Sequence, residues 1–207
     1  MYNYPYQIYC DMDGVLVDFE SGAVKAVNRE LQSGNPKFPE YAERAVQALG
    51  RDYITLDDIQ KYSSTQVEAA HEYMYILLED DENFWANIDW MPDGRQLWDY
   101  IRQFEPHILT APMNKGGKNG SLIGKMHWIK KNLGFNDEEL REKVNFSHEK
   151  WRYAKNHDGK PNILIDDFES KVKPFLEADG IGILHTSAPK TIRILKSIAN
   201  LKESSLF

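Results

Sequence analysis

The hydrophobic positions along the chain include five short β-prone runs, separated by longer segments of helical period. Each run ends at a polar or turn residue, as buried strands do. The runs lie at residues 8–10, 107–112, 144–147, 162–167 and 182–185. Helical patterns lie before the second run, at residues 92–104, and after the second, fourth and fifth runs, at residues 122–133, 169–178 and 190–201. Because strands that alternate with helices form parallel sheets, we predict an α/β fold with helices on both faces of the sheet.

The segment between the first two strands has a different pattern. Its apolar residues recur with a helical period at residues 22–31, 41–49 and 65–78. Thr55, followed three residues later by Asp58, adds a helix-start signal. An all-helical block directly after the first strand resembles an inserted cap. We therefore predict a core formed by residues 1–19 and 91–207, and a helical cap formed by residues 20–90.

Two carboxylates, Asp11 and Asp13, stand at the end of the first strand and are followed by Gly14. Residues at i and i+2 of an extended chain point to the same side, so the two charges are crowded together. Such a pair needs a cation or a raised pKa to relieve the repulsion. We predict that a divalent metal relieves it and that one carboxylate attacks phosphorus.

Polar residues recur at or after the other strand ends. Thr110 lies near the end of the second strand, Lys125 lies near the start of the following helix, and Asp166 and Asp167 end the fourth strand. Each is ordinary alone, since strand-end residues often cap helices or turns. In an open parallel sheet, however, ligands bind beyond the carboxyl ends of the strands. The recurrence therefore predicts one shared site.

The order Asp-x-Asp-Gly-Val, Ile-Leu-Thr, Lys and Ile-Asp-Asp resembles the haloacid-dehalogenase (HAD) superfamily of phosphohydrolases. The resemblance covers residues 6–19 and 92–185. It implies a Rossmann-like, doubly wound parallel sheet with a helical cap inserted after the first strand. It also implies an enzyme, a phosphoric monoester hydrolase that requires Mg2+.

The resemblance also implies roles for the acidic residues. Asp11 would attack the phosphoryl group and form an aspartyl-phosphate, and Asp13 would protonate the leaving group and later help to deprotonate water. Asp11, the backbone carbonyl of Asp13, and a carboxylate from Asp166 or Asp167 would hold Mg2+. In this family Asp167 would touch the metal with Asp166 in support, although the residues alone do not distinguish the two.

Further residues follow from the same resemblance. Thr110, with the backbone N–H of Ala111, would bind phosphate oxygens, and Lys125 would neutralise the transferring group. The family commonly has a serine at the position of Ala111, so one phosphate hydrogen bond is missing here.

Within the superfamily, the chain is most similar to the 5'-deoxyribonucleotidases. The matching segments are DMDGVLVDFE at residues 11–20, the stretch at residues 83–85, Thr-Ala-Pro at residues 110–112, and GKMHWIKKNLG at residues 124–134. The likeness implies that Phe19, Phe84 and Trp85 line a base pocket; packing of Phe84 and Trp85 between cap and core is the other explanation.

The composition limits the partners. A net charge of −7 argues against an extended nucleic-acid-binding surface or an anionic membrane, but not against a small phosphomonoester. A single cysteine, Cys10, fits a reducing cytoplasm, and no segment has the pattern of a membrane span or signal peptide. We expect a cytoplasmic protein with a nucleoside monophosphate as its partner, and a homodimer stays open.

Two other functions stay open. The same chemistry could act on a sugar phosphate or on a nucleic-acid 3'-phosphate. A non-enzymatic signalling module resembling a response-regulator receiver would also combine aspartates, threonine and lysine, but a compact receiver lacks the insertion at residues 21–90.

Overall fold

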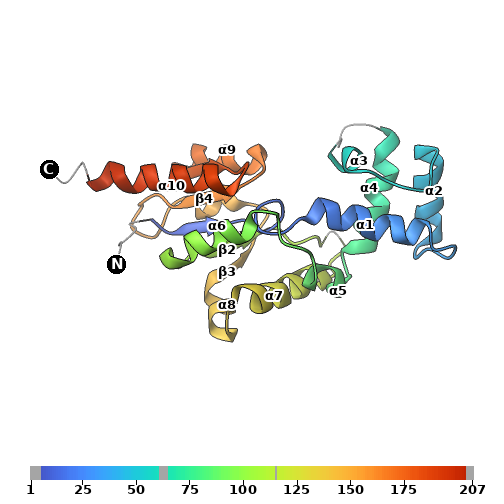
Figure 1. Ribbon diagram of the computed structural model, residues 1–207, viewed down its shortest axis with the longest axis horizontal. Coiled ribbons are helices and arrows are strands. Elements are labelled where there is room, and N and C mark those ends of the chain that lie inside the picture. The colour runs from blue at the N-terminus through green and yellow to red at the C-terminus, as the bar shows by residue number, and fades with distance from the viewer. Residues whose placement is uncertain (1–5, 61–64, 115, 204–207) are drawn as a thin grey trace. The chain divides into compact units, whose positions relative to one another are not determined.

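The computed structural model describes residues 6–60, 65–114 and 116–203. Its central feature is a five-stranded sheet in the order β3-β2-β1-β4-β5, in which every pairing is parallel (Figure 1). The strands are β1 (Ile8–Cys10), β2 (His107–Thr110), β3 (Val144–Phe146), β4 (Ile163–Asp166) and β5 (Ile181–Leu184). All five lie where the sequence predicts them, within a residue or two at each end. The predicted α/β fold with a doubly wound parallel sheet is therefore confirmed.

The first strand lies at the centre of the sheet. Cys10 pairs with Ile108 of β2 on one side and with Ile165 of β4 on the other, and the side chains of these three residues are fully buried. The chain adds β2 and β3 on one side of β1 and then crosses to add β4 and β5 on the other. The carboxyl end of β1 is thus the point where the winding direction reverses, the usual position of a ligand in this class of sheet.

Helices connect these strands. They are α6 (Gly94–Ile101), α8 (Asp137–Lys143), α9 (Glu169–Glu177) and α10 (Ala188–Glu203), with short 3-10 helices η1 (Arg102–Phe104) and η2 (Lys150–Tyr153). The helix predicted at residues 92–104 starts at Gly94 and ends as η1, because Glu105 adopts a left-handed conformation with φ 50°. Helix α9 packs on β4 and β5, whereas α10 packs on α6 and β5.

A second set of helices forms its own hydrophobic core. It contains α1 (Phe19–Leu31), α2 (Pro39–Leu49), α3 (Leu56–Gln60), α4 (Thr65–Leu78) and α5 (Glu82–Ala86). Small residues of α1 and α2 pack against larger side chains of α4 such as Tyr73 and Met74. Helix α2 packs against α4, and α1 contacts both α3 and α4.

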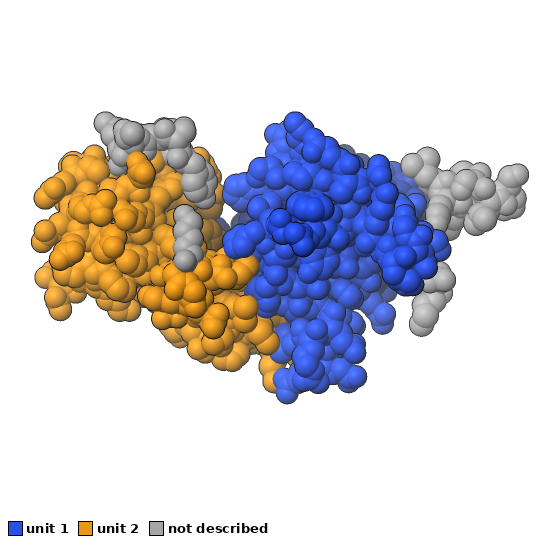
Figure 2. Space-filling model, turned by 180° about the vertical axis from the view of Figure 1, so that it is seen from behind, with its two compact units in different colours: residues 1–18, 90–111, 137–207 blue, residues 19–89, 112–136 orange. Residues whose placement is uncertain are grey.

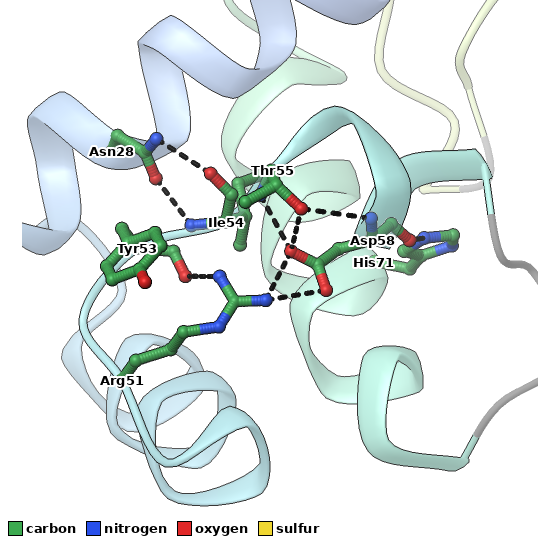
Figure 3. Close-up of polar contacts among 7 residues, drawn as sticks. All are labelled: Asn28, Arg51, Tyr53, Ile54, Thr55, Asp58 and His71. Carbon is green, nitrogen blue, oxygen red and sulfur yellow. Dashed lines mark hydrogen bonds and ion pairs between the residues drawn. The ribbon is translucent and has the colours of Figure 1, made fainter.

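The predicted helix start at Thr55 is present as a reciprocal cap (Figure 3). The backbone N–H of Thr55 donates to Asp58 at 2.7 Å, and the N–H of Asp58 donates to the Thr55 hydroxyl at 3.4 Å. The guanidinium of Arg51 contacts both oxygens of Asp58, at 2.7 and 2.6 Å. Asn28 of α1 bonds the backbone of Ile54 in both directions, which ties this segment to α1.

The chain divides into two compact units (Figure 2). The α/β unit contains residues 1–18, 90–111 and 137–207, and the helical unit contains residues 19–89 and 112–136. This division differs from the predicted one, which assigned residues 112–136 to the core.

Close packing of α7 (Gly120–Leu133) explains the difference. A Cβ atom on Gly120 would lie 2.4 Å from the backbone of Asp80, and one on Gly124 would lie 2.5 Å from Trp85 of α5. The indole N–H of Trp128 donates to the carbonyl of Ile88 at 2.8 Å. Glycine at two positions one helical turn apart thus brings α7 against the helical unit.

Among the described residues, no helix is long and apolar enough to cross a membrane.

Candidate active site

The site starts at Asp11, the first residue after β1. Its backbone N–H continues the sheet by donating to the carbonyl of Ile165 at 2.9 Å, and only 6% of the residue is exposed. The chain then turns tightly, since the N–H of Leu16 donates to Met12 and that of Gly14 donates to Val17. Gly14 has φ +71°, which suits glycine because it has no Cβ. The Asp-x-Asp-Gly sequence therefore places Asp11 in a buried position at the carboxyl end of the central strand.

Two further carboxylates join Asp11 from the neighbouring strand. Asp166 is the last residue of β4 and Asp167 follows it, so the parallel pairing of β1 with β4 brings both to the same edge. One carboxylate oxygen from each of Asp11, Asp166 and Asp167 lies within 4.8 Å of the others. The structure thus brings together the carboxylates that the sequence assigned to one metal site.

Lys150 at the start of η2 bridges this cluster. Its Nζ lies 2.7 Å from Oδ1 of Asp11 and 2.6 Å from Oδ2 of Asp166, and the residue is 2% exposed. Burial alone would lower the pKa of Lys150, but the charges of Asp11 and Asp166 outweigh that effect and raise it. Lys150 therefore stays charged and offsets part of the repulsion between the two carboxylates.

Asp166 and Asp167 differ in their hydrogen bonds. Oδ2 of Asp166 accepts from Lys150 and Oδ1 accepts from the backbone N–H of Phe168 at 2.9 Å. Oδ1 of Asp167 is buried and has no hydrogen-bond partner in the described part of the chain. Burial first, and the charges of Asp11 and Asp166 next, raise the pKa of Asp167 to about 8. A buried carboxylate in this condition costs free energy unless a proton or a cation offsets its charge.

The donor set fits Mg2+. All three candidate ligands are hard carboxylate oxygens, which Mg2+ prefers, and Asp167 offers an oxygen that no protein group uses among the described residues. The missing Cβ of Gly14 leaves room for this carboxylate, because a Cβ there would lie 2.2 Å from Oδ2 of Asp167. The carboxylate of Asp167 thus occupies space that any side chain at position 14 would fill.

Thr110 ends β2 beside this cluster within the α/β unit. It is fully buried, and its carbonyl accepts the N–H of Ser147 at 3.0 Å. Because β2 is the parallel neighbour of β1, Thr110 and the half-buried Ala111 lie at the same carboxyl edge as Asp11. Asp13 is half-buried on the turn after β1. The strand-end residues other than Lys125 therefore belong to a single edge of one unit.

Lys125 lies in α7 and belongs to the helical unit. It is fully buried, and its Nζ lies 4.8 Å from the centroid of the Trp85 ring. A cation over an indole face is favourable when it is desolvated. The cation that contacts Asp11 within the α/β unit is Lys150, which the sequence analysis did not select.

The three predicted base-pocket residues form one aromatic cluster in the helical unit. Phe19 stacks on Trp85 with ring centroids 5.3 Å apart and planes 9° apart, and Phe84 meets Trp85 edge to face. Trp85 is 1% exposed and its indole N–H donates to Leu78. With Phe19 stacked on it and Lys125 over its ring, Trp85 has no free face for a base in this conformation. Phe19 and Phe84 are only partly buried.

Comparisons with known proteins agree with this fold. No family model matches the chain, and no curated protein matches its sequence. Among solved structures, the chain is similar to a hydrolase from Streptococcus pneumoniae TIGR4, with 13% identity, coverage of 92% of this chain and 98% of that one, and a TM-score of 0.50. It is equally similar, with 10% identity and the same coverage and TM-score, to a protein described as a HAD-hydrolase from Bacillus subtilis, bound to magnesium. At such low identities the likeness shows that the chain shares the fold of these hydrolases.

Proposed function

We propose that this protein is a cytoplasmic, Mg2+-dependent phosphomonoesterase that hydrolyses nucleoside 5'-monophosphates through an aspartyl-phosphate. The observation that carries the proposal is the buried cluster in which Lys150 bridges Asp11 and Asp166 while Asp167 keeps an unpaired oxygen. An acidic cluster with its own fixed cation, at the carboxyl end of the central strand, suits the binding and transfer of an anionic group.

Asp11 is the proposed nucleophile. One of its carboxylate oxygens forms a bond to phosphorus as the bond from phosphorus to the leaving oxygen breaks, and Asp13 gives that oxygen a proton. Asp13 then takes a proton from water, which attacks phosphorus, releases phosphate and restores the Asp11 carboxylate. Asp13 is half-buried on the turn after β1, with its Oδ1 buried.

The surrounding residues hold charge and position. Lys150 orients Asp11 and offsets negative charge on the transferring group, and Thr110 with the N–H of Ala111 binds phosphate oxygens. Asp11, Asp167 and the carbonyl of Asp13 would hold Mg2+, which would supply further positive charge at the phosphoryl oxygens.

The nucleotide part of the proposal rests on the likeness to deoxyribonucleotidases and on the aromatic residues. Burial of Trp85 removes one of the three predicted stacking surfaces, which favours a second candidate, a small phosphoester such as a sugar phosphate.

Lys125 remains a proposed second cation for the phosphate. The variant Lys125→Met tests this role independently of Lys150.

A phosphate-release assay on a panel of nucleoside monophosphates and sugar phosphates, with Mg2+ or with a chelator, tests the proposal. We expect release from a nucleoside monophosphate that requires Mg2+ and is lost in Asp11→Asn. Release from sugar phosphates alone would favour the second candidate. Activity retained in Asp11→Asn would refute the assignment of the nucleophile, and a long-lived phosphorylated protein without turnover would favour a receiver-like module.

A further inference from the structure

The residues in and beside the acidic cluster differ in exposure. Asp11, Asp166 and Lys150 are each at most 6% exposed, whereas Asp13 and Asp167 are partly exposed. Asp13 and Asp167 are therefore the members of this group that reach the surface, although one carboxylate oxygen of each is buried. The residue that follows Asp167 is Phe168, and 44% of it is exposed.

The backbone of Phe168 is fixed by the cluster itself. Its N–H donates to Oδ1 of Asp166 at 2.9 Å, and its carbonyl accepts the N–H groups of Lys171 and Val172 at 2.9 and 3.1 Å. Phe168 is thus the N-cap residue of α9, attached directly to the carboxylate that contacts Lys150. The backbone that carries the ring is therefore already ordered before a ligand binds.

The ring of Phe168 is one of several large apolar side chains exposed on the surface, and it is the one next to Asp167. Within the described part of the chain, it has no stacking, edge-to-face or cation contact with another side chain. Leaving a large apolar ring in water forgoes the free energy of burial, and an exposed aromatic beside a site of charged groups is typical of ligand recognition.

We propose that Phe168 is a specificity-determining residue whose ring stacks on an aromatic ring in the leaving group of the substrate. The inference rests on the proposed phosphomonoesterase activity and narrows its substrate to phosphomonoesters whose alcohol part carries a planar ring, as nucleoside monophosphates do. Phe168 belongs to the α/β unit together with the reacting carboxylates. It therefore provides an aromatic surface that does not depend on Trp85.

Trp151 offers a matched control. It is also next to a cluster residue, Lys150, and its exposure of 45% is nearly the same. Its ring, however, already carries the guanidinium of Arg152 at 5.4 Å from the centroid, and Arg152 is held by Glu149 at 2.8 Å. Trp151→Ala therefore removes an equally exposed ring beside the site without removing the proposed stacking surface.

The test compares kcat/KM for a nucleoside 5'-monophosphate with kcat/KM for glycerol phosphate, which has no ring, in Phe168→Ala, Phe168→Leu, Phe168→Trp and Trp151→Ala. For the nucleotide we expect roughly a 10-fold loss in Phe168→Ala, a smaller loss in Phe168→Leu and near wild-type values in Phe168→Trp, in line with the usual strength of base stacking. For glycerol phosphate, and for Trp151→Ala with either substrate, we expect changes below about 3-fold. Thermal unfolding confirms that each variant is folded.

Equal losses on both substrates in Phe168→Ala, no loss on either, or a loss confined to Trp151→Ala would overturn the proposal. If the wild type releases phosphate from neither substrate, the proposed function fails on its own. Equilibrium dialysis of a nucleoside monophosphate in the presence of Mg2+ then tests the ring directly. Weaker binding in Phe168→Ala but not in Trp151→Ala would support the stacking surface, and any other result would refute it.

Discussion

Replacing Gly14 with alanine would push a methyl group into the carboxylate of Asp167. The new Cβ would lie 2.2 Å from Oδ2 and 2.6 Å from Cγ of Asp167, well inside any real contact distance. The backbone at Gly14 is also left-handed, with φ +71°, which strains any residue that has a Cβ. Gly14→Ala therefore combines backbone strain with displacement of one candidate metal ligand.

The two effects can be separated with Gly159. Its φ is +74°, nearly the same as that of Gly14, but a Cβ there would meet nothing within 4 Å. Left-handed strain alone costs about 1–2 kcal/mol, so Gly159→Ala should lose about that much free energy of unfolding. Gly14→Ala should lose the same amount and roughly 0.5–1.5 kcal/mol more, because Asp167 must leave its preferred rotamer.

Urea unfolding with and without Mg2+ measures both quantities. At an Mg2+ concentration of about 100 times its dissociation constant, the wild type and Gly159→Ala should each gain about 2.7 kcal/mol of stability. A variant that binds about 10-fold more weakly gains only about 1.4 kcal/mol at the same concentration, and this is the result expected for Gly14→Ala. The reasoning would be refuted if Gly14→Ala and Gly159→Ala lost equal stability and responded equally to Mg2+.

Three further changes test other parts of the structure. Lys150→Met should lower phosphate release by about 100-fold or more, since it removes the cation on Asp11; loss below 10-fold would contradict this. Tyr73→Phe removes a fully buried hydroxyl with no hydrogen-bond partner among the described residues, so urea unfolding should show stability unchanged or up to about 1 kcal/mol higher. Burial alone would raise the pKa of Asp58, but hydrogen bonds from Arg51 and Thr55 hold that pKa below the ordinary value of an aspartate. The wild type should therefore lose stability as the pH falls below about 3.8, and Asp58→Asn should be roughly 1–2 kcal/mol less stable at pH 7 with a weaker acid dependence.

The alternation of strands and helices was enough to predict the sheet, because each buried strand is a short apolar run that ends at a polar residue. The assignment of α7 was not accessible in the same way. Its helical pattern was correctly predicted, but its place in the helical unit depends on the contacts of Gly120 with Asp80 and of Gly124 with Trp85. These pairs are 40 and 39 residues apart in sequence, and they approach closely because glycine has no side chain. The periodicity of apolar residues cannot indicate such a contact.

The candidate site shows the same contrast. Asp11, Asp166 and Asp167 follow strands with strongly apolar runs, and the rule that ligands bind beyond strand ends brought them together correctly. Lys150 follows β3, whose three residues are only half-buried and whose apolar signal is weak. The same rule applied to that strand would have selected Lys150, four residues past its end. Lys125 was chosen instead because it lies in a segment that resembles a known motif.

The hydrogen bonds around the two adjacent aspartates, Asp166 and Asp167, distinguish two residues that the sequence leaves equivalent. Their side chains are chemically identical, but the protein already uses both oxygens of Asp166, through Lys150 and the N–H of Phe168. A metal bound at Asp166 would have to displace one of these bonds or share an oxygen with it, whereas Oδ1 of Asp167 is buried with no such bond among the described residues. Because an unpaired buried carboxylate oxygen is costly, a metal gains more at Asp167 than at Asp166. We therefore propose Asp167 as the direct ligand, whereas Asp166 contacts Lys150 and bonds the backbone at the start of α9.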